Sequence, residues 1–372
     1  MRFPEFEGEW KKEQLGDTAD FSKGAGISKE QLSEKGEPCI LYGELYTKYK
    51  SEVIYDIISK TDIDSTKSVR SQANDVIIPS SGETAEDIAT ARCVLKNNIL
   101  LGGDLNIIRL HNHSGSFMSY QLNGKRKYDI AKVAQGVSVV HLYAEHLKGV
   151  NTYNPCMEEQ EKIARLLSLL DERIATQNKI IEDLKKLKSA ISKKLLCNDK
   201  WTTYKIQNIA EIGRGRVISS VEIERQKHPL YPVYSSQTSN DGVMGYLDGY
   251  MFDGEYITWT TDGANAGTVF YRKGKFNCTN VCGTLKIQPN FDCYFVSLVL
   301  QQATQKYVSS NLANPKLMNN TMASIKISMP NIEAQRQLSK MFQTLDSCLS
   351  VHKRTYKMYL KEKQYLLRQM FI

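Results

Sequence analysis

Two stretches, MEEQEKIARLLSLLDERI at Met157–Ile174 and IEAQRQLSKMFQTLDSCL at Ile332–Leu349, decide how this chain is organised. Each begins two residues after a proline. Proline suits the start of a helix, because the N–H groups of the first turn have no partner within the helix. A shift of 175 positions superimposes the two stretches. The residues that recur are Pro155, Glu158, Gln160, Leu170 and Asp171, which fall on Pro330, Glu333, Gln335, Leu345 and Asp346.

Both stretches continue as long amphipathic helices whose apolar residues step by threes and fours, the period of a coiled-coil seam. The first seam comprises Ile163, Leu167, Leu170, Ile174, Ile181, Leu184, Ile191 and Leu195. The second comprises Leu338, Phe342, Leu345, Leu349, Tyr356, Tyr359, Leu366 and Met370. Polar residues interrupt the seams at matching places, Gln177 with His352 and Lys188 with Lys363. The matched interruptions indicate one helix that was duplicated.

Each helix extends for roughly 40 residues, or about 60 Å at 1.5 Å per residue. An apolar stripe of that length is unstable in water when nothing covers it. We therefore expect the two helices to pack on each other within the chain. The alternative is that each helix covers a separate domain, although a core of ordinary size is too short to cover such a stripe.

The region in front of each helix is repeated as well. With a shift of 191 positions, Trp10, Leu15, Ala19, Phe21, Gly24, Ile27 and Ser28 fall on Trp201, Ile206, Ala210, Ile212, Gly215, Ile218 and Ser219. Between these points the two halves differ, but both contain expected strands broken by Gly, Asn and Asp turns, with short helical stretches. The sequence predicts an α+β fold with two sheet-containing heads, each attached to a long helix.

The composition of the 372 residues, 41% hydrophobic and 24% charged, is that of a globular protein. There is no run of about 18 uncharged apolar residues to span a membrane, and the opening MRFPEFEGEWKKEQ lacks the apolar core of a signal peptide. We expect a cytoplasmic protein whose eight cysteines are free thiols. The net charge of +8 is compatible with a nucleic-acid partner without requiring one.

Common catalytic motifs are missing from the sequence. It contains no GxxxxGK[ST] loop for ATP and no GxSxG elbow for a nucleophilic serine, and its GRGR is a lone GxG. Cys278, Cys282 and Cys293 have poor spacing for zinc, and His111 and His113 have no further ligand nearby. We therefore expect a binding protein without catalytic residues or a metal.

The chain resembles the specificity (S) subunits of type I restriction–modification enzymes. The resemblance rests on the opening RFPEFEGEW, the two helix starts with LLSLLDERI and MFQTLDSCL, and the ending YLLRQMFI. The inner stretches DVIIPSSGETAEDIATA and YPVYSSQTSNDGVMGY are also similar to the family. Together these segments extend the resemblance over essentially the whole chain.

The resemblance implies four segments: a target recognition domain at 1–154, a central helix at 155–197, a second target recognition domain at 198–329 and a C-terminal helix at 330–372. It implies that the helices form an antiparallel intramolecular coiled coil with pseudo-two-fold symmetry. Each domain would read one half of a bipartite double-stranded DNA site. The chain would bind two methyltransferase (M) subunits and restriction (R) subunits. Those partners would hold S-adenosylmethionine, ATP and Mg²⁺, and this chain would hold no cofactor.

Candidate DNA-binding residues are polar side chains on expected loops, because such groups match base edges and loops on a rigid sheet commonly carry function. In the first half they are Lys23, Lys48, Tyr49, Ser80, Ser81 and Glu83, with Arg126 and Lys127 assigned to phosphates. In the second half they are Arg214, Arg216, Ser235, Ser236, Gln237, Thr238, Asn240, Thr260, Thr261, Asp262, Asn265 and Lys316. Most of these residue types also form turns, which is the alternative for each.

Contacts with the M subunits are expected on repeated surfaces, because one chain would bind two copies of one partner. Our candidates are Gln160, Leu166, Gln335 and Met341, near the two helix starts. Two other classes stay open at this point. One is a stand-alone DNA methyltransferase or nuclease, and the other is a structural coiled-coil protein that dimerises between chains and binds no DNA.

Overall fold

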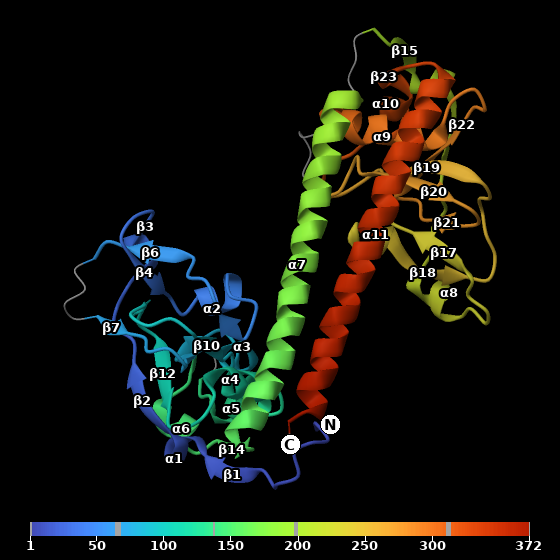
Figure 1. Ribbon diagram of the computed structural model, residues 1–372. Helices are drawn as coiled ribbons and strands as arrows, with labels where there is room; N and C mark the ends of the chain where they lie inside the picture. Colours follow the sequence, from blue (N-terminus) through green and yellow to red (C-terminus); the bar gives the residue numbers. More distant parts are fainter. Residues whose placement is uncertain (1, 64–67, 137, 197–199, 310–313, 372) are drawn as a thin grey trace. The chain divides into compact units, whose positions relative to one another are not determined.

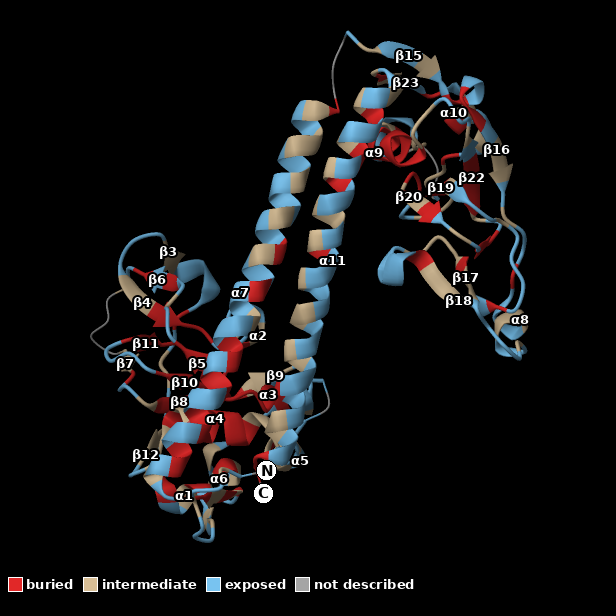
Figure 2. Ribbon diagram, turned by 45° about the vertical axis from the view of Figure 1, so that its right-hand side comes forward, coloured by how far each residue is buried: buried red, intermediate tan, exposed pale blue. Residues whose placement is uncertain are grey.

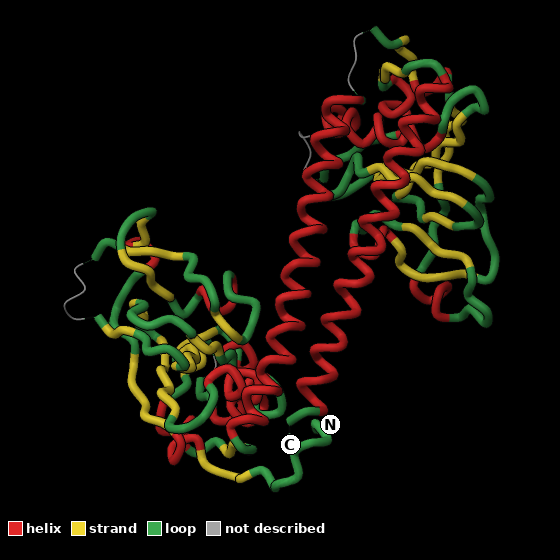
Figure 3. Tube along the Cα trace, in the orientation of Figure 1, coloured by secondary structure: helices red, strands yellow, loops and turns green. Residues whose placement is uncertain are grey.

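The computed structural model describes residues 2–63, 68–136, 138–196, 200–309 and 314–371. The fold is α+β, as predicted, and the chain divides into two units (Figure 1, Figure 3). Unit 1 comprises the residues up to Ile180 and those from His352 onward, and unit 2 comprises Ile181–Val351. The predicted boundary at 197–198 lies outside the described residues.

Within the described part of unit 1, two sheets have five strands each. The first has the order β2 (Ala19–Lys23), β12 (Leu105–Leu110), β8 (Asp75–Pro79), β10 (Arg92–Val94) and β5 (Val53–Ile54). The second has the order β3 (Leu32–Ser33), β6 (Ser59–Thr61), β4 (Glu37–Ile40), β11 (Leu100–Leu101) and β7 (Val69–Arg70). Two strand pairs complete the unit, β1 (Lys11–Gln14) with β14 (Asn151–Asn154) and β9 (Ser81–Gly82) with β13 (Val140–His141).

Short helices cover the sheets of unit 1. They are α1 (Leu15–Thr18), η1 (Lys29–Gln31), α2 (Glu44–Thr47), α3 (Ala85–Ile88), α4 (Gly115–Asn123), α5 (Lys127–Val133) and α6 (Ala144–Lys148). The short helical stretches expected in the first half are thus present, with α4 and α5 as the two longest of these helices. Met118 and Leu122 of α4 are fully buried against Val76 and Ile108 of the first sheet, where buried residues gather (Figure 2).

Unit 2 is built around a four-stranded sheet with the order β16 (Ala210–Arg214), β22 (Cys282–Ile287), β19 (Glu255–Thr260) and β20 (Val269–Lys273). A three-stranded sheet has the order β18 (Val243–Leu247), β17 (Tyr231–Tyr234) and β21 (Asn277–Cys278), and β15 (Thr202–Lys205) pairs with β23 (Lys326–Met329). The short helices are η3 (Ile206–Asn208), α8 (Ser220–Glu224), η4 (Ser239–Gly242), α9 (Cys293–Ala303), η5 (Thr304–Tyr307) and α10 (Asn319–Ser324).

The repeat seen in the sequence recurs in the strand pairing. β1 pairs with β14 in unit 1 as β15 pairs with β23 in unit 2, at positions related by the two sequence shifts. The three antiparallel strands β2, β12 and β8 likewise correspond to β16, β22 and β19. The sequence between these strands differs, but the three strands that support it are paired in the same order in both units.

An aromatic pair packs at equivalent places in the two units. The Trp10 ring lies 5.8 Å from the Phe117 ring at an interplanar angle of 63°. The Trp201 ring lies 5.9 Å from the Phe295 ring, also at 63°. Edge-to-face pairs of this kind add about 0.5–1.5 kcal/mol to their area burial. Each pair joins the start of a module to the main helix of its head.

The long helices are α7 (Met157–Leu195) and α11 (Ile332–Gln369), which confirms the two helices predicted from the seams. Within unit 1 their segments are antiparallel, because Gln177 of α7 contacts His352 of α11 while the earlier Asp171 pairs with the later Lys363. Within unit 2, Lys188 of α7 pairs with Asp346 of α11. The two ion pairs are one interaction repeated, because the shift of 175 relates both the lysines and the aspartates.

The outer ends of the seam contact the heads as well as the other helix. Ile163 and Leu167 are buried in one cluster with Phe117 of α4 and Phe371. At the start of α11, Phe342 is fully buried in a cluster with Phe295 of α9. The apolar stripe of each long helix is therefore covered partly by the other helix and partly by the adjoining head.

Gln160 and Gln335 are buried, and this corrects their assignment as partner contacts. Gln160 is 1% exposed and Gln335 is 2% exposed. The amide of Gln160 accepts the N–H of Ser114, the residue before α4, at 3.0 Å and donates to the Pro155 carbonyl at 2.9 Å. In unit 2, Gln335 makes the same two bonds, with Asp292 before α9 at 3.0 Å and with Pro330 at 2.8 Å. Each glutamine thus joins the start of α4 or α9, the main helix of its head, to the start of a long helix. We call the two hydrogen bonds of each glutamine a glutamine clamp.

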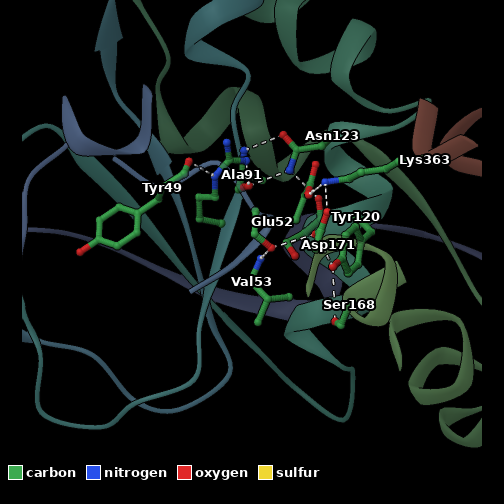
Figure 4. Close-up of polar contacts among 12 residues, drawn as sticks. Tyr49, Glu52, Val53, Ala91, Tyr120, Asn123, Ser168, Asp171 and Lys363 are labelled. Carbon is green, nitrogen blue, oxygen red and sulfur yellow. Dashed lines mark hydrogen bonds and ion pairs between the residues drawn. The ribbon is translucent and has the colours of Figure 1, made fainter. Parts of the chain in front are cut away.

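Lys363 lies in a buried polar network of unit 1 (Figure 4). Its ammonium pairs with the carboxylates of Glu52 and Asp171. Asp171 also accepts hydrogen bonds from the hydroxyls of Tyr120 and Ser51, each at 2.8 Å. Lys363, Glu52 and Asp171 are all at most 9% exposed. The C-terminal helix, the central helix and the head of unit 1 therefore meet at one desolvated cation.

Arg92 adds a second buried cation beside this network. Its guanidinium donates to the carbonyls of Tyr49 at 3.2 Å and Ala91 at 2.9 Å. Burial lowers the pKa of Arg92, and burial raises the pKa of Glu52 against the opposing effect of Lys363. Two acids and two bases balance one another here, so the loss of one charge leaves another buried and uncompensated.

Removing the cation of Lys363 is expected to destabilise the chain strongly. Lys363→Met leaves Glu52 and Asp171 buried without their partner, at an expected cost of about 3–5 kcal/mol in the free energy of unfolding. The matched control is Lys188→Met, whose side chain is 24% exposed beside an Asp346 side chain that is 42% exposed. There the expected cost is only about 0–1 kcal/mol. Urea unfolding followed by circular dichroism measures both, and equal shifts would contradict this assignment.

Breaking a glutamine clamp is expected to cost about 1–3 kcal/mol, because a buried N–H and a buried carbonyl lose their partners. Gln335→Leu removes the clamp of unit 2. Gln337→Leu, two residues further along α11 at an exposed position, is the control. The same unfolding measurement applies, and a Gln335→Leu variant no less stable than the control would argue against the clamp.

Candidate nucleic-acid interface

Four of the predicted residues of unit 2 meet at the end of its main sheet. Arg214 ends β16, and its guanidinium donates to the Thr261 hydroxyl at 3.1 Å and lies 3.4 Å from an oxygen of Asp262. The ammonium of Lys316 lies 3.7 Å from the other Asp262 oxygen. The side chains of Arg214 and Lys316 are 35% and 42% exposed, so both cations can reach a ligand. We call Arg214, Thr261, Asp262 and Lys316 corner 2.

Three predicted residues of unit 1, Lys23, Ser80 and Ser81, occupy the matching place, which we call corner 1. Lys23 ends β2 as Arg214 ends β16. The Lys23 ammonium lies 6.0 Å from the centroid of the Tyr143 ring, which is 46% exposed. The Tyr143 ring in turn stacks with that of His141, whose strand pairs with the strand of Ser81.

The backbone makes the two corners equivalent. In corner 1, the N–H of Ser80 donates to the carbonyl of Asp104 at 2.7 Å. In corner 2, the N–H of Thr261 donates to the carbonyl of Val281 at 2.9 Å. These two hydrogen bonds correspond. In unit 1 the bond joins the residue after β8 to the residue before β12, and in unit 2 it joins the residue after β19 to the residue before β22. The two heads thus present different side chains from one geometry.

Four of the predicted DNA-binding residues are buried. Their burial corrects the prediction that these side chains contact bases directly. Tyr49, Ser80, Thr260 and Thr261 are between 0% and 7% exposed. The Tyr49 hydroxyl accepts the N–H of Ile58 at 3.1 Å inside unit 1. Ser80 and Thr261 fix the corner backbone instead, because their main-chain bonds hold the ends of two strands together.

Lys48 stands at the rim of a pocket of unit 1 with a volume of about 760 Å³. Its ammonium donates to Glu44 at 2.7 Å and to the Ser59 hydroxyl at 2.6 Å, and the side chain is still 38% exposed. Ile27 and Tyr42 line the same pocket. Lys48 is therefore held in place by an internal ion pair while one side of it faces outward.

The predicted residues Ser235, Ser236, Gln237, Thr238 and Asn240 lie on the turn that follows β17. Their exposure rises along the turn, from half-buried Ser235 to exposed Thr238 and Asn240. The side-chain amide of Gln237 donates to the carbonyl of Val243 and so holds the turn from within. Ser236, Thr238 and Asn240 are the members of this set that remain available to a ligand.

The remaining candidates are Glu83, Arg126, Lys127, Arg216 and Asn265. Arg216 is held by Glu222, and its side chain is 47% exposed. Arg126 lies over the Tyr153 ring at 5.2 Å and 3.3 Å from Asp129. Lys127 is half-buried, and Glu83 and Asn265 are exposed on turns.

Of the two apolar candidates for partner contacts, Leu166 is 37% exposed on α7, with the equally outward Leu169 nearby. Met341, the counterpart of Leu166 under the shift of 175, is partly buried against the core of unit 2. The two helix starts therefore differ in how much apolar surface they leave exposed.

Sequence reasoning missed Tyr143, His141 and Arg272. Tyr143 lies near Lys23, and His141 stacks on Tyr143, next to the pairing of β13 with β9, a contact between segments about sixty residues apart. Arg272 stands on β20 and contacts the turn after β17. Strand alternation could have placed Arg272 on the same face as Phe270, opposite the core-facing Val269 and Tyr271, but its partner in the turn could not have been predicted from the sequence.

Among the described residues, no group of three or more His, Cys, Asp or Glu side chains is arranged to hold a metal ion. None of the helices in the described ranges combines the length and the apolar character needed to cross a membrane.

The chain is similar to several known proteins. A putative type I specificity subunit of Mycoplasma pneumoniae, S.MpnORF201P, is 39% identical over 188 residues, which is 50% of this chain and 78% of that protein. The MpnII specificity subunit of the same organism is 43% identical over 143 residues, 38% of this chain and 43% of that protein. The crystal structure of a type I restriction–modification S subunit from M. genitalium matches with a TM-score of 0.73 at 18% identity. The match covers 100% of this chain and 97% of the M. genitalium chain. At 18% identity it shows a shared fold alone.

The family itself is established by a match over most of the chain. Residues 7–186 and 198–358 each match the type I restriction modification DNA specificity domain. The two matched ranges coincide with the two repeated modules. The chain therefore belongs to the family of the type I restriction modification DNA specificity domain.

Proposed function

We propose that the chain is the non-catalytic DNA-specificity subunit of a type I restriction–modification system, and that its two heads read the two halves of a bipartite double-stranded DNA site. The observation that carries this proposal is the pair of corners. One backbone geometry carries Lys23 and Ser81 in unit 1 but Arg214 and Asp262 in unit 2. Equivalent positions with different side chains are what two readers of different base sequences require.

The chemistry of each corner suits duplex DNA. The guanidinium of Arg214 can donate two hydrogen bonds to the acceptors of guanine in the major groove, and Asp262 holds it in orientation. Lys316, at the edge of corner 2, is placed to neutralise a phosphate. In corner 1, Lys23 lies beside the exposed ring of Tyr143, a combination that suits a phosphate and an adjacent sugar or base.

We assign the spacing of the half-sites and the binding of partners to the long helices. Two methyltransferase (M) subunits are proposed to bind near the helix starts, at Leu166 on α7 and at the corresponding region around Met341 on α11. Restriction (R) subunits would join the same complex. S-adenosylmethionine, ATP and Mg²⁺ are assigned to these partners and not to this chain. We place the complex in the cytoplasm.

Sequencing of modified bases tests the proposal. DNA is taken from cells that express the chain with its cognate M subunit, and from cells that express either protein alone. A split motif methylated only when both proteins are present is the expected result. Methylation by the chain alone would support a stand-alone methyltransferase instead. Unmodified DNA in the presence of a demonstrated complex would contradict the proposal.

Shortening one side chain of a corner to alanine is expected to weaken the discrimination between bases in one half-site of the motif. Arg214→Ala should reduce discrimination in the half-site read by unit 2 by about 1–3 kcal/mol, because a side chain that reads a base is lost. Lys23→Ala should affect the half-site of unit 1. Lys205→Ala, an exposed lysine on β15, is the control for loss of positive charge. Competition binding with single-base variants of the motif measures the effect, and a loss spread evenly over both half-sites would speak against separate readers.

A further inference from the structure

A buried arginine, Arg272 on β20, contacts the turn that carries the most exposed polar candidates of unit 2. The side chain is 7% exposed. Its Nη2 donates to the carbonyl of Asp241 at 2.8 Å, and its Nε donates to the Thr258 hydroxyl at 3.3 Å. The guanidinium therefore joins the sheet of unit 2 to residue 241, in the middle of the turn.

Aromatic rings flank the same guanidinium. Its central carbon lies 3.6 Å from the centroid of the Tyr234 ring and 4.4 Å from that of Phe270. Tyr234 ends β17, directly before the turn. Burial lowers the pKa of Arg272, with smaller opposing contributions that include Tyr234 and Asp241. A planar, weakly hydrated cation tolerates such a site better than an ammonium does, so lysine would not reproduce it.

The turn itself has a backbone that needs external support. Asn240 and Asp241 both have positive φ values, 50° and 51°, followed by Gly242 at 83°. Two successive non-glycine residues in this region are costly and persist only where the surroundings hold them. A Cβ added to Gly242 would lie 3.2 Å from Nη2 of Arg272, so the arginine also packs closely against the glycine.

We infer that Arg272 is the positioning residue of a base-reading turn, Ser235–Gly242, in unit 2; this inference rests on the proposed DNA-reading function. Arg272 does not touch the ligand itself. It holds the carbonyl of Asp241, and with it the left-handed segment that turns Thr238 and Asn240 outward. Among the residues that the structure describes, the side-chain amide of Asn240 donates one long hydrogen bond, 3.5 Å to the Val243 carbonyl, which leaves it for the edge of a base in duplex DNA.

The test uses the full chain with its M subunit in cells, read by sequencing of modified bases. The variants are Arg272→Lys, which keeps the charge, and Arg272→Met, which keeps the length. The control is Lys273→Met, on the same strand as Arg272, which removes the exposed ion pair between Lys273 and Glu255 of β19. For both Arg272 variants, the ratio of methylation at the cognate half-site of unit 2 to that at single-base variants should fall on the order of 10-fold. The half-site of unit 1 and the control should remain unchanged.

Each other outcome overturns the inference. An unchanged motif in Arg272→Met would show that the turn does not need Arg272 or does not read bases. Relaxation of both half-sites together, or loss of complex formation by both variants, would make Arg272 a general folding residue. Failure of the proposed function is recognised separately, because then the unaltered chain with its M subunit yields no split motif.

Discussion

One ion pair between the two long helices occurs once in each unit, and within unit 1 the attachment of the head to both helices depends on it. Lys363 meets Asp171 in unit 1, and Lys188 meets Asp346 in unit 2. Each aspartate also accepts a hydrogen bond from a tyrosine on the main helix of its head, at 2.8 Å in unit 1 and 2.5 Å in unit 2. A charge within an apolar seam tolerates only the register that pairs it. In unit 1, where the pair is buried, it therefore fixes the two helices against each other and the head against both.

The two long helices and the ion pair between them form a common frame. The ion pair of this frame is more deeply buried in unit 1 than in unit 2. In unit 1 the ion pair is joined by Glu52 and Arg92 and is almost sealed from water, whereas in unit 2 it is half-exposed. Above this common frame the heads diverge, with a second five-stranded sheet in unit 1 and a three-stranded sheet in unit 2 among the described residues. Fixed attachment with variable loops allows one architecture to carry two different recognition surfaces.

The frame could be predicted from the sequence, and much of the interface could not. Periodicity and the repeat determined the two helices and the two heads, because both are properties of residue order. The repeated Gln160 and Gln335 were interpreted as partner contacts, but a repeated polar residue indicates a repeated environment, and here that environment is interior. The burial of Thr261 and the support of a turn by Arg272 depend on contacts between distant segments, and no local pattern encodes them. The position of Arg214 at a strand end, beside a glycine turn, could be predicted because it is a local feature, and its contact with DNA stays a prediction.

The central claim is that two separate surfaces of one chain read two separate blocks of bases. Base-removal interference on a duplex carrying the methylated sequence, bound by the chain with its M subunit, tests this most directly. We predict two short blocks in which loss of any base weakens binding, with an interval between them in which loss of a base has no effect. The account would be contradicted if the required bases formed a single uninterrupted block. It would also be contradicted if bases were required in only one of the two predicted blocks.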